Sequence, residues 1–223
     1  MTYSLTSYTH AQLHIAQRGS GQPVIFVHGG EEAGGATAFA AQAPLAEAYT
    51  LVMPDLPGHG HSPAQGRVSA DRDALLIADL FDRPVHLVGH SYGGAVALKA
   101  AVRRPDKVKS LMLVEPATLD IGINDPDVRQ MVLELAQAVA VPDLRERLQG
   151  FASVIGIHKT WRDPLSETDR TLAEELPVIL SLSGTASGTT TASFTSVSGP
   201  NRSGRHSDAG YFRRPSSRMG TFV

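Results

Sequence analysis

A serine framed by glycines separates a mainly apolar run from a helical pattern near the middle of the chain. Residues 85–88 have the character of a buried strand, and residues 92–104 place their apolar side chains on one side of a helix. Between them stands Gly-His-Ser-Tyr-Gly-Gly, centred on Ser91. The glycines allow a sharp turn from strand to helix. This unit predicts an α/β fold in which the hydroxyl of Ser91 is presented above a sheet.

Short apolar runs alternate with helical patterns over the first 120 residues, as in proteins built from βαβ units. We expect strands at residues 3–8, 12–17, 24–27, 50–53, 85–88 and 111–114. We expect helices at residues 39–49, 70–81 and 92–104. The predicted fold is a mostly parallel sheet flanked by helices.

The pattern changes to successive helices after Asp125-Pro126, a pair typical of a helix start. This predicts a helical insertion at about residues 122–176, within a core domain of residues 1–182. Ser166 and Asp169 form a plausible capping box before the last helix of the insertion. Strand character returns at residues 177–182.

The remaining segment, residues 183–223, differs in composition from the rest. Of the twenty residues 181–200, fourteen are Ser, Thr or Gly, and from residue 181 onward five arginines accompany a single acidic residue, Asp208. Such a stretch buries too little apolar area to offset its ordering entropy. We therefore predict that this segment is poorly ordered and does not supply a closing strand and helix.

Charge and composition narrow the class of partner. The net charge of −2 offers no basic face for nucleic acid or anionic lipid, and the absence of cysteine excludes disulfides and thiolate sites. No leader segment and no apolar run long enough to span a bilayer is expected. These features predict a cytoplasmic protein with a small-molecule partner and leave the oligomeric state open.

Two further segments stand at the ends of predicted strands. His28-Gly29-Gly30 follows the strand at 24–27, and residues 55–62 fit the pattern D-x-x-G-x-G-x-S. Together with the turn at Ser91, their order and spacing resemble the α/β-hydrolase superfamily, in its serine-nucleophile branch with a helical cap.

That resemblance implies roles for particular residues. Ser91 would be the nucleophile, the backbone N–H groups of Gly30 and Tyr92 would form the oxyanion hole, and no cofactor would be needed. His28, Gly29 and His90 would line the pocket or support its loops. A serine oxygen suits acyl carbon, so the implied substrates are esters, lactones, thioesters, amides or C–C bonds beside a ketone.

The rest of the catalytic triad is harder to assign. Family order places the acid and then the histidine after the serine, which leaves His206 or His158 as the base, and His206 fits better by position. No carboxylate follows residues 177–182, the usual place of the acid. Glu115, at the end of the strand at 111–114, occupies the alternative place.

Other readings stay open. The C-terminus could be scrambled by a reading-frame change, which would leave a catalytically incomplete chain, or the fold could bind a small ligand without turnover. His59 and His61 could suggest a metal, but no third ligand stands at useful spacing along the sequence, so we predict no metal site.

Overall fold

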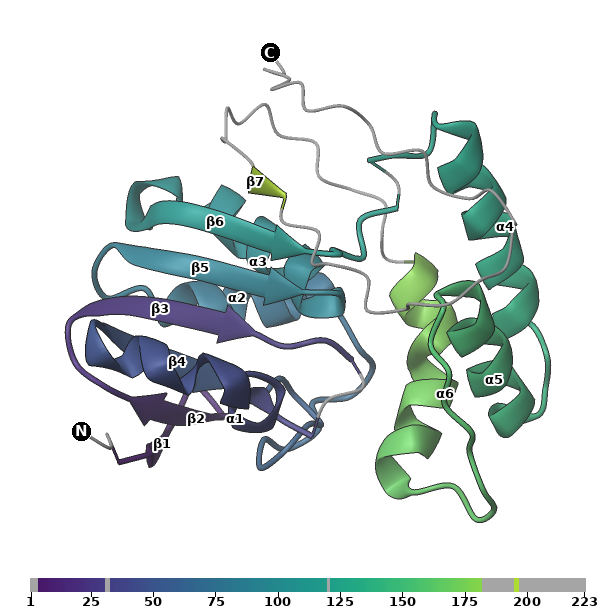
Figure 1. Ribbon diagram of the computed structural model, residues 1–223, viewed down its shortest axis with the longest axis horizontal. Coiled ribbons are helices and arrows are strands. Elements are labelled where there is room, and N and C mark those ends of the chain that lie inside the picture. The colour runs from purple at the N-terminus through teal and green to yellow at the C-terminus, as the bar shows by residue number, and fades with distance from the viewer. Residues whose placement is uncertain (1–3, 31–32, 120, 182–194, 197–223) are drawn as a thin grey trace.

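A twisted sheet forms the body of the molecule and is mostly parallel (Figure 1). The computed structural model describes residues 4–30, 33–119, 121–181 and 195–196. The strands are β1 (Thr6–His10), β2 (Leu13–Arg18), β3 (Gln22–Val27), β4 (Tyr49–Pro54), β5 (Val85–His90), β6 (Val108–Val114) and β7 (Thr195–Ser196). Their order is β1-β2-β4-β3-β5-β6-β7, with β1, β2 and β4 antiparallel in turn and the other pairs parallel. The predicted α/β class is confirmed.

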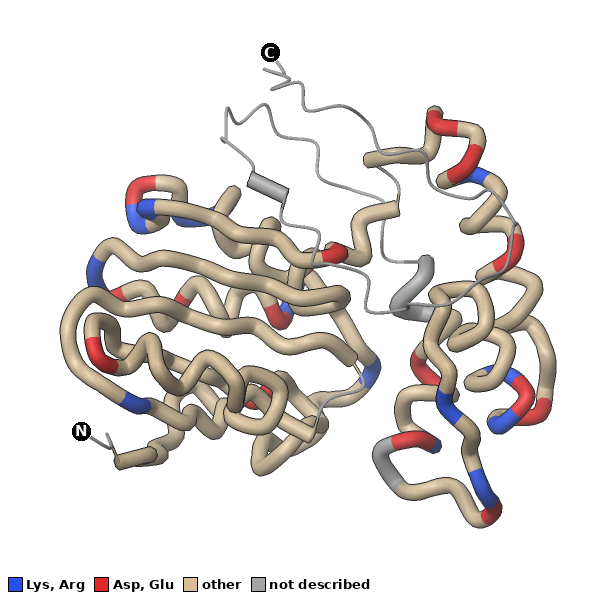
Figure 2. Tube along the Cα trace, in the orientation of Figure 1, with Lys and Arg blue, Asp and Glu red and all other residues tan. Residues whose placement is uncertain are grey.

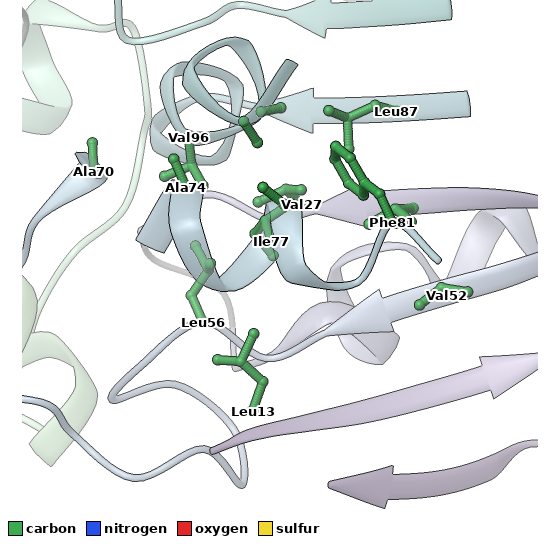
Figure 3. Close-up of a cluster of buried hydrophobic side chains, with 14 of the residues drawn as sticks. Leu13, Val27, Val52, Leu56, Ala70, Ala74, Ile77, Phe81, Leu87 and Val96 are labelled. Carbon is green, nitrogen blue, oxygen red and sulfur yellow. The ribbon is translucent and has the colours of Figure 1, made fainter. Parts of the chain in front are cut away.

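Helices cover both faces of this sheet. α2 (Ala70–Asp79) and α3 (Tyr92–Arg103) pack on one face, where Leu13, Ile77 and Leu87 are fully buried (Figure 3). Burying side chains of this size contributes about 1.5–3 kcal/mol each. The short α1 (Gly35–Ala38) and a 3₁₀ helix (Ala40–Glu47) cover the opposite face, and another 3₁₀ turn (Pro105–Lys107) precedes β6.

The helix predicted at residues 39–49 is present, as a 3₁₀ helix and not an α-helix. The segment forms the 3₁₀ helix Ala40–Glu47, in which Pro44 lies inside the helix. Proline has no N–H to donate and its ring crowds the preceding turn of an α-helix. A tighter winding with bonds three residues apart, such as Gln42 N–H to the carbonyl of Phe39 at 3.1 Å, accommodates it.

The predicted helical insertion is present as α4 (Pro126–Val139), α5 (Leu144–Val154) and α6 (Glu167–Ser181). Asp125 caps α4 by accepting from the N–H groups of residues 127 and 128, and Ser166 Oγ accepts from the N–H of Asp169. The three helices share a buried cluster of their own: Val139, Leu148, Ala152, Trp161, Leu172, Ala173 and Leu176. They lie beyond the carboxyl ends of β3, β5 and β6 (Figure 1).

The strand predicted at residues 177–182 is wrong, because α6 continues through Pro177 to Ser181. A proline removes the bond that the carbonyl four residues earlier would accept, here that of Ala173. Arg147 Nη1 on α5 donates to this carbonyl at 2.9 Å. The guanidinium therefore replaces the missing backbone donor and lets the helix tolerate the proline.

The C-terminal segment lies mostly outside the described residues. The prediction that it is poorly ordered therefore stays a prediction. Thr195 and Ser196 are described, and they pair in parallel with Met112 and Leu113 of β6. The prediction that residues from about Ser183 onward do not form a closing strand and helix concerns mostly residues outside those described, and it stays a prediction. An edge strand offers unpaired backbone groups, and pairing with them requires no apolar side chain.

Charged residues of both signs are interspersed along the described chain (Figure 2). None of the helices among the described residues is both long and apolar enough to cross a membrane. The predictions of a small-molecule partner and of a cytoplasmic location stay predictions.

Candidate active site

Ser91 occupies a strained turn between β5 and α3. Its backbone has φ 51° and ψ −122°, a conformation that residues with a side chain rarely adopt. The residue is half-buried, and it follows directly on the carboxyl end of β5. Strain of this kind persists only where the surrounding structure enforces it.

Two glycines beside Ser91 are required by close approach of the backbone. A Cβ on Gly93 would lie 2.2 Å from the carbonyl oxygen of His28 and 2.3 Å from that of Val27. A Cβ on Gly89 would lie 2.5 Å from the carbonyl oxygen of Gly93. The start of α3 therefore packs directly on the loop that leads from β3 to Gly30.

The end of β6 holds the backbone of Ser91 from the other side. The N–H of Ser91 donates to the carbonyl of Val114 at 3.0 Å, and the N–H of Ala117 donates to the carbonyl of Ser91 at 2.9 Å. Glu115 lies between these two contacts and has a positive φ of 45°. The structure thus brings the backbone of Glu115 beside Ser91, with its side chain exposed.

Tyr92 begins α3, so its backbone N–H is one of the donors that a helix leaves without an intrahelical partner. Its side chain is buried, and the hydroxyl donates to Asp73 Oδ2 on α2 at 2.7 Å. Arg72 donates to the other oxygen of Asp73 from Nε and Nη2, at 3.1 and 2.9 Å. Burial raises the pKa of the Asp73 carboxyl, and these hydrogen bonds only partly oppose it.

Burial also raises the pKa of the Tyr92 phenol, and the neighbouring Asp73 carboxylate acts in the same direction. The hydroxyl therefore stays protonated as a donor at ordinary pH. Sequence reasoning missed Asp73. The sequence did contain a signal: Asp73 is an acidic residue directly before Ala74, on the side of α2 that is buried.

The loop from β3 to Gly30 is fixed by two histidines. His28 is fully buried, and its Nε2 accepts from the N–H of Leu56 at 2.9 Å while its Nδ1 faces the carbonyl of Gly29 at 2.6 Å. His59 Nε2 lies 2.8 Å from the carbonyl oxygen of Gly30. Both rings join this loop to the turn that follows β4, so His28 supports the geometry of the loop.

That turn, residues 55–62, is organised around the carboxylate of Asp55. Oδ1 accepts from the N–H of Gly35 at 2.8 Å, and Oδ2 accepts from the N–H of His61 at 2.9 Å. The hydroxyl of Ser62 donates to the carbonyl of Asp55 at 2.7 Å. These bonds explain why the motif has Asp and Ser at its two ends. Both side chains stabilise a structural turn at the sheet edge.

The helical insertion reaches toward the same region through Glu175 on α6. Burial raises the pKa of its carboxyl, the charge of His59 opposes this, and the charge of Asp73 adds to it. Glu175 therefore lies within electrostatic range of both core residues.

A cavity of about 620 Å³ lies elsewhere in the insertion, lined by residues 142–145, 163–165 and Arg170.

Neither of the two predicted bases is seen close to Ser91. His206 is outside the described residues, so its role stays a prediction. His158 is exposed in the loop that follows α5. Gly29 is buried in the loop after β3, and His90 is half-buried directly before Ser91; their pocket-lining role stays a prediction.

A sequence profile of the alpha/beta hydrolase family matches residues 24–215. The chain therefore belongs to this family. The match extends past residue 183 and includes the position of His206.

Similar proteins include two enzymes that act on esters by name. A pimeloyl-[acyl-carrier protein] methyl ester esterase of Chromobacterium violaceum is 45% identical over 46% of this chain and 40% of its own length. The lipase LipV of Mycobacterium tuberculosis is 36% identical over 54% and 46%. The chain thus matches less than half the length of either relative.

Among solved structures, the N-acyl homoserine lactonase AidH in complex with N-butanoyl homoserine aligns with a TM-score of 0.51 at 20% identity. The alignment covers 79% of this chain and 67% of that one. At this identity the likeness supports the fold alone.

Proposed function

We propose that the chain is a serine hydrolase that acts on an ester-like small molecule. The strained turn at Ser91 is the observation that carries this proposal: its φ of 51° is maintained by backbone bonds to Val114 and Ala117. Strain that the fold enforces at one serine, at the start of a helix, is typical of a presented nucleophile.

In the proposed reaction the hydroxyl oxygen of Ser91 attacks the acyl carbon, and a base takes the hydroxyl proton. The carbonyl oxygen becomes an oxyanion, which accepts hydrogen bonds from the N–H groups of Gly30 and Tyr92. Collapse of this intermediate expels the alcohol, which leaves with the proton. Water then attacks the acyl-enzyme by the same route and releases the acid.

We assign His206 as the base and Glu115 as the acid that orients it. The position of the Glu115 backbone beside Ser91 and the extension of the family match past His206 support this assignment. The neutral tautomer of such a histidine accepts the serine proton, and a carboxylate on its other nitrogen stabilises the resulting imidazolium.

Carboxylic esters are the proposed substrate class, ahead of lactones, thioesters and C–C bonds. The names of the two ester-cleaving relatives support this choice. The cap formed by α4, α5 and α6 lies over the carboxyl edge of the sheet, where it would select the acyl group.

A fluorophosphonate probe tests the nucleophile. Peptide mass spectrometry should find the adduct on Ser91, and Ser91→Ala should abolish both labelling and turnover of an activated aryl ester. Labelling of another serine, or an unlabelled Ser91 in protein that is folded by circular dichroism, would overturn the proposal.

A further inference from the structure

Three potential metal ligands converge on the turn after β4. The Oδ2 atom of Asp55 lies 2.9 Å from Nδ1 of His14 and 3.6 Å from Nδ1 of His61. The candidate ligand atoms of all three side chains lie within 4.8 Å of one another. His14 comes from β2, some forty residues before the other two, so their spacing in the sequence hides the cluster.

We propose that His14, Asp55 and His61 bind a divalent transition metal ion, with zinc as the best fit. Zinc accepts imidazole nitrogen at about 2.0–2.1 Å and carboxylate oxygen at about 2.0–2.2 Å. In a tetrahedral site those bond lengths place neighbouring ligand atoms about 3.3 Å apart. The two distances from Asp55 Oδ2 lie on either side of that value.

The ligand types favour zinc over calcium or magnesium. Two imidazoles and one carboxylate suit zinc, whereas the harder cations prefer sites composed of oxygen alone. The side chain of His61 is 80% exposed, so a fourth position is open to water. A set of three protein ligands and one water is common for zinc.

Two of the three ligands are held in place by other contacts. Asp55 is buried, and its Oδ1 accepts from the N–H of Gly35 at 2.8 Å. The N–H of His14 donates to Ser62 Oγ at 2.8 Å, and Ser62 in turn bonds to the Asp55 carbonyl. The exposed ring of His61 is the ligand that moves to complete the site.

Metal binding would alter one proton position. Nδ1 of His14 faces Asp55 Oδ2 and donates to it when protonated. On binding, this nitrogen turns its lone pair to the cation, and the ring keeps its one proton on Nε2. The positive ion then replaces the proton between the two side chains.

The proposed site lies at the same carboxyl edge of the sheet as Ser91, with β3 between β4 and β5. Its turn also carries His59, which contacts the carbonyl of Gly30. A bound ion would therefore stabilise the turn that supports the oxyanion loop.

Isothermal titration with zinc chloride tests the site, using the full chain after dialysis against EDTA. We expect one ion per chain and a rise in the melting temperature on adding zinc. His61→Ala should weaken binding by at least about tenfold and remove most of the thermal shift. Cobalt, used as a coloured substitute, should give visible bands typical of four-coordinate nitrogen and oxygen ligation.

His10→Ala is the matched control. His10 Nε2 lies 2.9 Å from Asp79 Oδ2, which is also a histidine–aspartate pair on the surface, and among the described residues it belongs to no three-ligand cluster. This variant should bind zinc as the unaltered chain does. The proposal fails if the chain shows no stoichiometric binding, or if His61→Ala and His10→Ala bind equally well; the cluster is then a hydrogen-bonded turn only.

Discussion

The hydroxyl of Tyr92 donates a hydrogen bond of 2.7 Å to Oδ2 of Asp73. Tyr92 directly follows Ser91 at the start of α3, whereas Asp73 lies on α2. The two side chains are 4% and 2% exposed. A neighbouring helix thus anchors the residue whose N–H we place in the oxyanion hole.

Replacing Tyr92 with Phe should therefore affect both stability and turnover. It leaves Asp73 buried with one partner fewer, which should lower the free energy of unfolding by about 1–3 kcal/mol. Loss of the anchor should reduce kcat more than it changes KM, because the oxyanion forms only in the transition state. Urea denaturation and ester kinetics measure the two effects.

Tyr49→Phe is the control for this experiment, since Tyr49 is 36% exposed. Its unfolding free energy should change by less than about 0.5 kcal/mol. Equal losses in the two variants would contradict a specific role for the bond to Asp73.

The raised pKa of Asp73 predicts a pH dependence of stability. Because the folded chain favours the protonated form, the stabilising contribution is complete below the ordinary value of 3.8 and is lost as pH rises through the higher folded pKa. Asp73→Asn lacks this titration. Relative to the unaltered chain, it should therefore gain stability in urea unfolding as pH rises from 3.8 through the folded pKa of Asp73.

Asp71, on the same helix, should behave in the opposite way. The hydrogen bond from Arg103 lowers the pKa of its carboxyl, so its contribution is present above the ordinary value and is lost on acidification. Asp71→Asn should lose stability relative to the unaltered chain as pH rises through the acid range. The same sign in both variants would refute the assignment for Asp73.

Gly93 should not tolerate a methyl group. Its Cβ would lie within 2.3 Å of two carbonyl oxygens, so Gly93→Ala should cost at least about 3 kcal/mol or prevent folding. Gly66 has a positive φ of 76°, and a Cβ there meets nothing within 4 Å. Gly66→Ala should cost only about 1–2 kcal/mol of backbone strain, as thermal unfolding can show.

His206→Ala should lower the turnover of an activated ester by about three powers of ten, if the triad acts as a unit. Glu115→Gln should cost less. His158→Ala removes an exposed side chain in the loop after α5 and should leave turnover unchanged. If instead His158→Ala loses activity and His206→Ala keeps it, the base is His158.

The sequence predicted the central strands and the turn at Ser91 because these depend on local patterns. A continuous apolar run that ends at turn residues indicates a strand without reference to distant residues. The strand–turn–helix unit at Ser91 is likewise one continuous stretch of sequence. One local pattern led to a wrong prediction. Residues 177–182 are apolar enough for a strand, but α6 continues from Pro177 to Ser181, and Arg147, thirty residues earlier, supplies the donor that the proline removes.

Contacts between residues far apart in the sequence could not be predicted. The register of β2 against β4 brings His14 to Asp55, and no periodicity in the sequence encodes that pairing. The same applies to Asp73, whose partner Tyr92 lies on the next helix. Pairings of this kind depend on tertiary packing, which a single sequence does not display.

The separate core of the insertion has an evolutionary consequence. Because Leu148, Trp161 and Leu176 pack among α4, α5 and α6, substitutions on the surfaces of these helices can accumulate without disturbing the sheet that holds Ser91. Substrate preference could then diverge in one module while the chemistry is retained in the other. If the insertion selects the substrate as proposed, exchanging residues 125–181 between family members should alter selectivity.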